Sequence, residues 1–171
     1  MTDCKTTPSA ETSSESPASR YTPSDLEARC YYQGISPTPP RLLYRTDLPS
    51  RPWVPPGPTK CAGGVFGHKL NQLWESESDN VGPKIMSFLS EEGVDWSSVE
   101  LIRFLSYYED DNEEEKPIKG PPVIWIGVNP DHAEDQADQI HRSAERIQGL
   151  LKDLDIEDVN VEYRASAYRL L

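Results

Sequence analysis

A strand pattern, a helix pattern and a second strand pattern follow one another near the end of this 171-residue chain, and this succession constrains the fold most. Residues 123–128 (VIWIGV) are apolar on both faces, as is typical of a strand in the middle of a sheet. Residues 133–154 repeat apolar side chains at steps of four and three and predict an amphipathic helix of about six turns. Residues 159–164 (VNVEYR) alternate strictly between apolar and polar side chains, which predicts a half-exposed strand. We therefore expect a right-handed crossover that joins the two strands through the helix.

Two more elements precede this unit. Residues 98–107 (SVELIRFLSY) carry apolar side chains on both faces and predict a strand, joined to residues 123–128 by a hairpin with an acidic loop. Residues 68–92 have helical spacing that Gly82 and Pro83 interrupt. We therefore expect a kinked helix or two short helices, with Pro83 in a first turn.

The order of these elements determines the predicted fold class. If residues 41–45 form a first strand, the order is βαββαβ, which defines a ferredoxin-like α+β sandwich. Both helices then cover one face of an antiparallel sheet, with residues 123–128 in the centre and residues 159–164 at an edge. Without the first strand, we expect only the three other strands to form the sheet.

Proline divides the chain near residue 60, because eleven of its 16 prolines lie in residues 1–58. Residues 1–34 predict a disordered tail rich in Ser, Thr and Pro. Residues 35–67 predict an extended, Pro-rich arm with a possible short strand and a Gly-rich loop. The α+β core is then expected at residues 68–165, followed by a tail at residues 166–171.

The charge balance argues against several classes of partner. The chain has 17 basic and 29 acidic side chains and a formal charge of −12. Nucleic acids and anionic membrane surfaces attract clustered Lys and Arg, so we expect neither as a partner. Residues 123–128 form the longest fully apolar run, too short to span a membrane, and residues 1–20 lack the apolar segment of a signal peptide. We therefore expect a cytoplasmic protein.

Cysteine and histidine spacing argues against a resident metal or other cofactor. Cys4, Cys30 and Cys61 are odd in number and widely spaced, which predicts reduced thiols rather than a disulfide framework or a zinc ribbon. His132 and His141 fall on opposite sides of the predicted helix and so cannot chelate one metal ion. We expect no cofactor.

Several Trp-rich and strand-like motifs are spread along the chain. They are Thr38-Pro39-Pro40-Arg41-Leu42-Leu43, Pro52-Trp53, Gly67-His68-Lys69-Leu70-Asn71-Gln72-Leu73-Trp74-Glu75, Val94-Asp95-Trp96-Ser97-Ser98-Val99, Val123-Ile124-Trp125-Ile126-Gly127-Val128 and Ile156-Glu157-Asp158-Val159-Asn160-Val161-Glu162. Over roughly residues 35–165 they resemble a family of uncharacterised fungal proteins. In longer members of that family a similar block precedes a degenerate trypsin-like region, which is absent here. The resemblance therefore implies kinship and lends no chemistry.

A Gly-rich loop before residue 68 is the first candidate site. Its backbone N–H groups and one lysine would hold an anion, although the spacing is not that of a P-loop and a flexible joint is the simpler explanation. The residues of this candidate are Gly63, Gly64, Gly67 and Lys69. Cys61 and His68 would also form a thiolate–imidazole pair, but no local signature supplies an orienting carboxylate or an oxyanion hole.

Other signals point to partner proteins. Pro37, Pro40 and Arg41 resemble a polyproline ligand, and Trp53 is expected to clip the arm onto the domain. Residues 109–115 carry six negative charges and predict a mobile, self-repelling loop, with Ca²⁺ or a basic protein as alternative ligands. The predicted edge strand at 159–164 offers main-chain groups to a partner strand or a second copy.

Three functions follow from these signals. The leading hypothesis is a non-catalytic protein-interaction or accessory domain, because no convergent set of polar residues is evident. One alternative is a small-molecule-binding regulatory domain, by analogy with ferredoxin-like sheets. The other is a cysteine-dependent enzyme that uses Cys61 and His68. Five aromatic side chains are expected in the core rather than in a ligand site: Trp74, Phe88, Trp96, Phe104 and Trp125.

Overall fold

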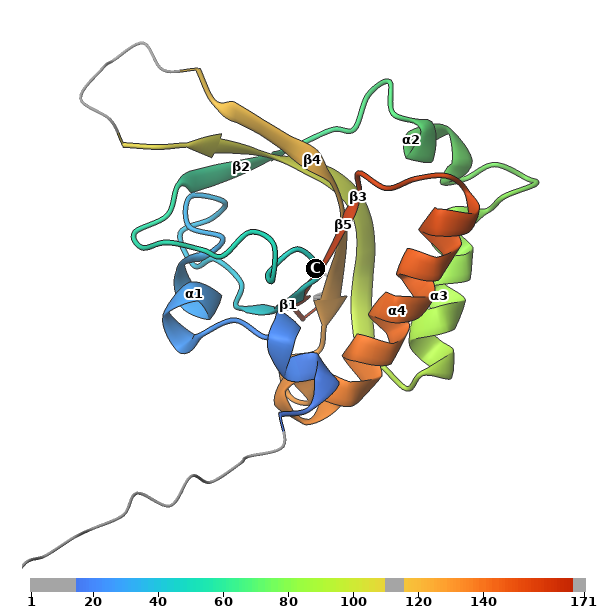
Figure 1. The fold of residues 1–171 in the computed structure, drawn as a ribbon, viewed down its shortest axis with the longest axis horizontal. Helices are drawn as coiled ribbons and strands as arrows, with labels where there is room; N and C mark the ends of the chain where they lie inside the picture. The colour runs from blue at the N-terminus through green and yellow to red at the C-terminus, as the bar shows by residue number, and fades with distance from the viewer. Residues whose placement is uncertain (1–14, 110–115, 168–171) are drawn as a thin grey trace, which may run out of the picture.

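Five strands form one mixed sheet in the computed structural model, which describes residues 15–109 and 116–167 (Figure 1). The strands are β1 (Leu42–Arg45), β2 (Thr59–Gly63), β3 (Trp96–Tyr107), β4 (Ile118–Val128) and β5 (Asn160–Ala165). Their order across the sheet is β1-β5-β4-β3-β2. The helices are η1 (Pro17–Tyr21), α1 (Asp25–Cys30), α2 (Lys69–Leu73), α3 (Val81–Glu91), η2 (Ala133–Gln136) and α4 (Ala137–Asp153).

The middle strand is β4, as the apolar run at residues 123–128 predicts. All six of these residues are buried. β4 pairs in parallel with β5, with Ile124 opposite Val161, so the chain must cross over through α4 between them. β4 also pairs antiparallel with β3, which confirms the predicted hairpin.

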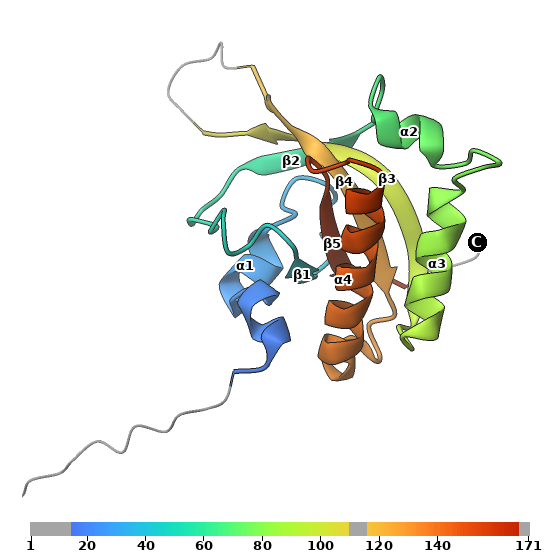
Figure 2. The same cartoon turned by 45° about the vertical axis from the view of Figure 1, so that its right-hand side comes forward.

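The helices α3 and α4 lie side by side on one face of the sheet (Figure 2). Ile85 of α3 and Ile147 of α4 are fully buried against Ile124 and Ile126 of β4. The predicted helix at residues 68–92 is two helices, α2 and α3, and Pro83 lies in the first turn of α3. The sequence pattern therefore predicts these elements, except that residues 133–136 of the expected long helix form the separate 3-10 helix η2.

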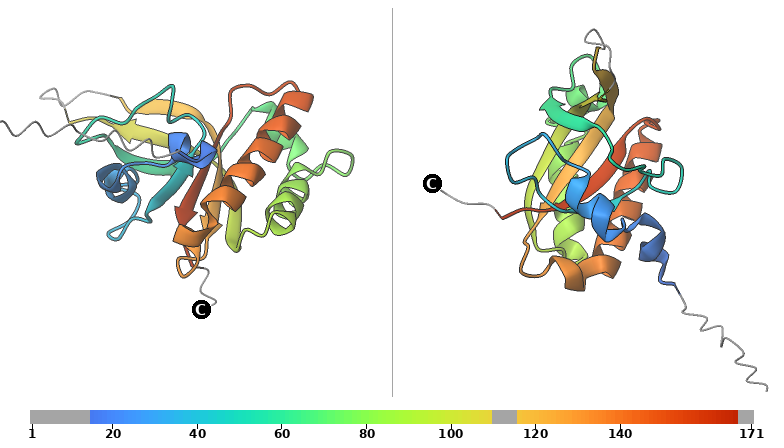
Figure 3. Two further views of the ribbon diagram at one scale, coloured as in Figure 1. Left: turned by 60° about the horizontal axis from the view of Figure 1, so that its bottom comes forward. Right: turned by 90° about the vertical axis from the view of Figure 1, so that its left-hand side faces the viewer.

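The segment from α1 to Ile35, which we call the N-terminal layer, covers the opposite face of the sheet (Figure 3), whereas η1 packs against α4. Tyr31 and Tyr32 follow α1 and pack against Phe104 and Trp125. Tyr32 is completely buried. The expectation of a disordered tail through residue 34 is therefore wrong for the described residues 15–34, because these aromatic side chains bury enough apolar surface to order the segment.

The ferredoxin-like topology is also wrong. In that fold the first strand lies inside the sheet, whereas β1 pairs only with β5 and occupies an edge. β1 has four residues and follows Pro39 and Pro40, which lack backbone N–H groups, so a position with only one strand neighbour suits it. As a result β5 is an inner strand, and the predicted edge at 159–164 is already occupied.

A fifth strand, β2, lies where the Gly-rich loop was expected to be irregular. Residues 59–63 pair antiparallel with β3, with Lys60 opposite Ser106. Their Lys and Gly content predicts no strand, but β3 is long and offers them an open edge. The tertiary contact therefore overrides local propensity.

Several remaining expectations concern single side chains. Phe104 and Trp125 are buried, and Trp74, Phe88 and Trp96 pack partly buried against the core, as expected. Cys30 and Cys61 are free thiols. Within the two described stretches, the helices are too short or too polar to cross a membrane.

We predict that the N-terminal layer belongs to the same cooperative unit as the sheet. The substitution Tyr32→Ala is expected to lower the free energy of unfolding by about 3–5 kcal/mol, since it removes a fully buried aromatic ring. Urea denaturation checks this value. Phe66→Ala is the control, because Phe66 is 85% exposed and its loss is expected to cost about 0.5 kcal/mol or less. A similar, small effect of both substitutions would contradict the prediction.

Candidate functional site

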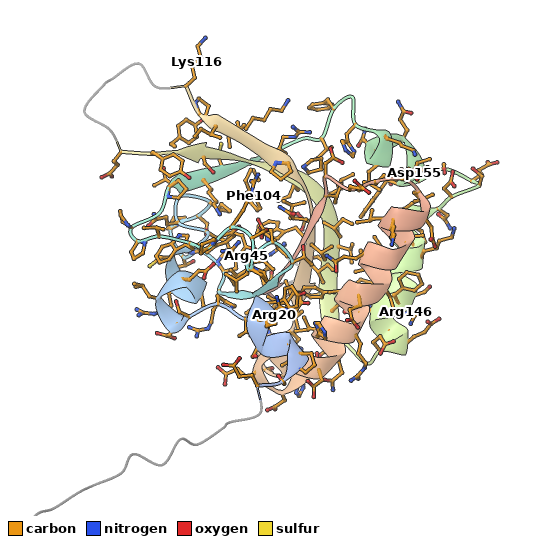
Figure 4. The ribbon with its side chains drawn as sticks, viewed as in Figure 1. Arg20, Arg45, Phe104, Lys116, Arg146 and Asp155 are labelled. Carbon is orange, nitrogen blue, oxygen red and sulfur yellow. The ribbon has the colours of Figure 1, made fainter. Side chains whose placement is uncertain are left out.

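A pocket of about 460 Å³ lies between the sheet and the N-terminal layer. Each strand contributes a side chain to it: Arg45 from β1, Lys60 from β2, Phe104 from β3, Val123 from β4 and Glu162 from β5. Figure 4 shows Arg45 and Phe104 on the side of the sheet away from α3 and α4. We call this cavity the Lys60 pocket.

Lys60 is the most unusual residue of the pocket. Side chains alternate along β2, so Lys60 faces the pocket on one side of the sheet and Cys61 faces the other side. Lys60 is only 7% exposed. It makes no ion pair and no side-chain hydrogen bond with any described residue, and its Nζ atom lies 3.1 Å from the centre of the Tyr31 ring. The sheet thus holds an unpaired amino group against an aromatic face.

The electrostatic environment weakens protonation of this amino group. Burial lowers the pKa of Lys60 from 10.5 to about 8, because the protonated form loses its hydration. The negative charge of Glu162 opposes this shift, and the positive charge of Arg45 adds to it. At pH 7 Lys60 is therefore mainly an ammonium, with about a tenth of it present as the neutral amine.

Glu162 lies on the inner strand β5 and is completely buried on the floor of the pocket. The hydroxyl of Tyr31 donates to its Oε1 atom at 2.8 Å, and the hydroxyl of Tyr32 donates to Oε2 at 2.7 Å. Burial raises the pKa of Glu162, whereas the nearby charge of Lys60 lowers it. Both oxygens are thus held by neutral donors rather than by a cation.

Arg45 is the second buried cation of the pocket, and the protein engages most of its guanidinium donors. Nε donates to Glu27 of α1 at 2.8 Å, and Nη1 donates to Asp47 at 2.9 Å. Nη2 donates to the backbone carbonyl of Arg51 at 2.8 Å. Arg45 therefore orders the wall of the pocket, where four contacts hold its guanidinium.

The Pro-rich arm forms the outer wall. Trp53 packs against the buried cluster around Tyr32, which confirms the expectation that it clips the arm onto the domain. The chain turns at Gly57, which has a φ of +69°, and a Cβ atom there would collide with the Trp53 indole. Only glycine therefore fits under this ring. Three exposed apolar side chains surround the mouth of the pocket: Val54, Tyr108 and Ile118.

The predicted anion loop lies elsewhere. Gly63 ends β2, and Gly67 turns with a φ of +75° before α2. The Lys69 ammonium donates to the backbone carbonyl of Leu154. Gly64 lies under the ring of Phe66. The lysine of this candidate thus already has an acceptor within the chain.

Cys61 and His68 have different neighbours. Cys61 Sγ lies 3.9 Å from the hydroxyl of Tyr107. His68 Nδ1 accepts from the backbone N–H of Leu70 and so caps α2, and its Nε2 atom lies 3.0 Å from Asp158. No contact links the thiol to the imidazole among the described atoms. Asp158 thus supplies beside His68 the carboxylate that sequence reasoning did not find, but the Cys61 thiol makes no contact with His68 among the described atoms.

The predicted interaction residues are only partly free. Arg41 forms an ion pair with Asp25 of α1 at 2.7 Å, and Pro40 is half-buried, while Pro37 is exposed. Apart from Glu109, the acidic run at residues 109–115 lies outside the described residues.

The two helix histidines also differ in their surroundings. His132 is exposed, and Nδ1 of His141 lies 2.8 Å from the hydroxyl of Tyr44. Nowhere in the described stretches do three or more metal-ligating side chains gather.

Sequence reasoning missed Lys60 and Glu162. Lys60 lies in a segment expected to be a loop, and the alternation around Glu162 predicts a solvent-facing side chain. The usable signal was the Tyr31-Tyr32 pair, since two adjacent aromatic residues in a supposed tail need a surface to pack on. The two tyrosines pack on the face of the sheet from which the side chains of Lys60 and Glu162 project.

Comparisons with protein-family models, with curated proteins and with solved structures found no match for this chain. The resemblance to uncharacterised fungal proteins therefore stays a prediction.

We predict a pH-dependent penalty from Lys60. Between its folded pKa of about 8 and its unfolded value of 10.5, the unfolded chain binds more protons at this residue. The free energy of unfolding of the wild type should therefore rise with pH, relative to Lys60→Met, by about 3 kcal/mol across this window. Urea denaturation of both proteins from neutral pH upward measures the difference. Lys84→Met, at an exposed position of α3, is the control and is expected to change the free energy of unfolding by about 0.5 kcal/mol or less. If the difference in free energy of unfolding between the wild type and Lys60→Met does not change with pH, the prediction is contradicted.

Proposed function

We propose that this chain binds a small, neutral organic molecule in the Lys60 pocket. The observation that carries the proposal is the almost fully buried Lys60 side chain, which faces a cavity and has no hydrogen-bond or ion-pair partner among the described residues. Burial destabilises the charged form of Lys60 despite its contact with the Tyr31 ring, as its lowered pKa indicates, and an apolar residue at this position would avoid the penalty. Perturbed, unpaired titratable groups in a cavity are typical of functional sites.

The donors and charges of the pocket indicate the polarity of the ligand. An ammonium group only donates hydrogen bonds, so the ligand needs an acceptor such as a carbonyl oxygen. The charged groups in or beside the pocket are three cations, Arg45, Arg51 and Lys60, and three carboxylates, Glu27, Asp47 and Glu162. Their formal charges cancel, so no net positive charge selects an anionic ligand, and a neutral carbonyl compound suits the pocket.

The apolar walls and the volume of the pocket indicate the apolar part of the ligand. Phe104, Trp53 and Val123 present apolar surface, and the cavity volume of about 460 Å³ falls within the usual range for small-molecule sites. A single aromatic or branched aliphatic group with a carbonyl substituent suits this combination. The small-molecule hypothesis is thus favoured over the cysteine-dependent enzyme, whose residues lie apart.

The protein-interaction hypothesis keeps one supporting observation. Val54, Ile118 and Tyr108 are 72%, 60% and 55% exposed and stand together around the mouth of the pocket. Exposed apolar side chains that cluster are typical of interaction surfaces. A partner protein that inserts a side chain into the pocket is therefore the second candidate.

We predict that benzamide, a neutral carbonyl compound, binds the wild-type chain in ligand-observed NMR, and that benzoate binds more weakly. Lys60→Met should weaken benzamide binding about tenfold or more, because a hydrogen bond to a charged group contributes about 1.5–3 kcal/mol. Lys84→Met should leave binding unchanged.

Three results would argue against the small-molecule function. They are absence of benzamide binding, stronger binding of benzoate than of benzamide, and equal binding to wild type and Lys60→Met. The double substitution Val54→Ser and Ile118→Ser separates the two candidates, since it should disrupt a protein contact at the mouth while benzamide still binds.

A further inference from the structure

We propose that Lys60 forms a covalent imine with an aldehyde or ketone bound in the Lys60 pocket. This inference rests on the proposed function and specifies its ligand class. Its support is the placement of one amino group, which comes from a paired strand, is almost fully buried and faces a cavity.

The position of the amino group suits attack on a bound carbonyl. Lys60 belongs to β2, whose backbone is paired with β3, and the backbone N–H of Lys60 also donates to the carbonyl of Gln33 at 2.8 Å. The nitrogen lies over the Tyr31 ring, which supplies no proton acceptor of the strength of a carboxylate. Since the strand cannot move freely, a ligand in the pocket meets the nitrogen in a defined geometry.

The protonation state of Lys60 supports the same conclusion. Imine formation needs the free amine, and burial lowers the pKa of Lys60 to about 8. The charged groups that act on it are Glu162 from β5, Arg45 from β1, Asp47 after β1 and Glu27 from α1. These charges shift the pKa of Lys60 in opposite directions, so burial has the largest effect on that pKa.

The step balances without any further reagent. The amine lone pair attacks the carbonyl carbon and a C–N bond forms. The C=O π electrons move to the oxygen, which takes one of the two protons from the nitrogen and becomes a hydroxyl group. The carbinolamine then loses that hydroxyl and the remaining N–H proton as water, and a C=N bond forms. No electron acceptor or donor is consumed, and the reaction is reversible by hydrolysis.

The other lysines provide an internal comparison. Lys84 is exposed on α3, on the far side of the sheet, so its ammonium is hydrated. Lys69 donates to the carbonyl of Leu154 at the end of α4. Neither combines burial with a cavity, so a carbonyl reagent should prefer Lys60 to both.

The experiment treats the full chain with benzaldehyde and sodium cyanoborohydride at neutral pH. The reductant converts any imine to a stable secondary amine, and peptide mass spectrometry then locates it. We expect Lys60 to be modified about tenfold or more faster than Lys84, because its free-amine fraction is larger. The rate at Lys60 should level off above its pKa of about 8, and a rate that keeps rising well above that pH would contradict the proposal.

Controls distinguish the imine from simple binding. Lys60→Arg, checked for folding by circular dichroism, should lose the preferred adduct, and Lys84→Arg should keep it. Benzamide, which occupies the same pocket but forms no imine, should slow modification of Lys60 only. Equal rates at Lys60 and Lys84, with benzamide still bound, would overturn the imine and leave the proposed function standing. Absence of both binding and preferential modification would overturn both.

Discussion

The carboxylate of Glu162 links the two ends of the folded chain, because it accepts hydrogen bonds from Tyr31 and Tyr32 inside the protein. A buried carboxylate without donors would cost several kcal/mol, roughly the size of a domain's whole stability. β5 can therefore carry Glu162 only while the N-terminal layer covers the sheet. The ion pair between Arg45 and Glu27, 2.7 Å long and almost fully buried, ties α1 to β1 in the same way.

This arrangement also explains why Lys60 has no hydrogen-bond or ion-pair partner among the described residues. The lone pairs of Glu162 point to tyrosine hydroxyls, and Asp47 and Glu27 are taken by Arg45. The ammonium of Lys60 is left with an aromatic face and a cavity. A fold selected for stability alone would place an apolar side chain there. The N-terminal layer thus supplies the hydrogen bonds that Glu162 needs, and it also helps to form the pocket to which we assign ligand binding.

Sequence patterns predict the elements in which apolar residues recur at regular spacing without interruption. The apolar run at 123–128 and the amphipathic repeat at 133–154 identify β4 and α4, and their succession implies the parallel pair of β4 with β5. The same reasoning offered β1 as a short strand but placed it wrongly in the sheet, and it missed β2. Both strands are short and have proline or glycine nearby. Strands of this kind exist because a longer strand offers them an edge, which no local pattern records.

By itself, the sequence determined one buried strand, two amphipathic helices, the hairpin and the chemical character of a chain with a net charge of −12. Only the tertiary structure decided which strands lie at the edges and what covers the second face. It also decided that Lys60 and Glu162, 102 positions apart in the chain, line one cavity. The physical reason is that periodicity reports which side of an element is apolar, whereas the burial of a charge depends on a layer that arrives from elsewhere in the chain.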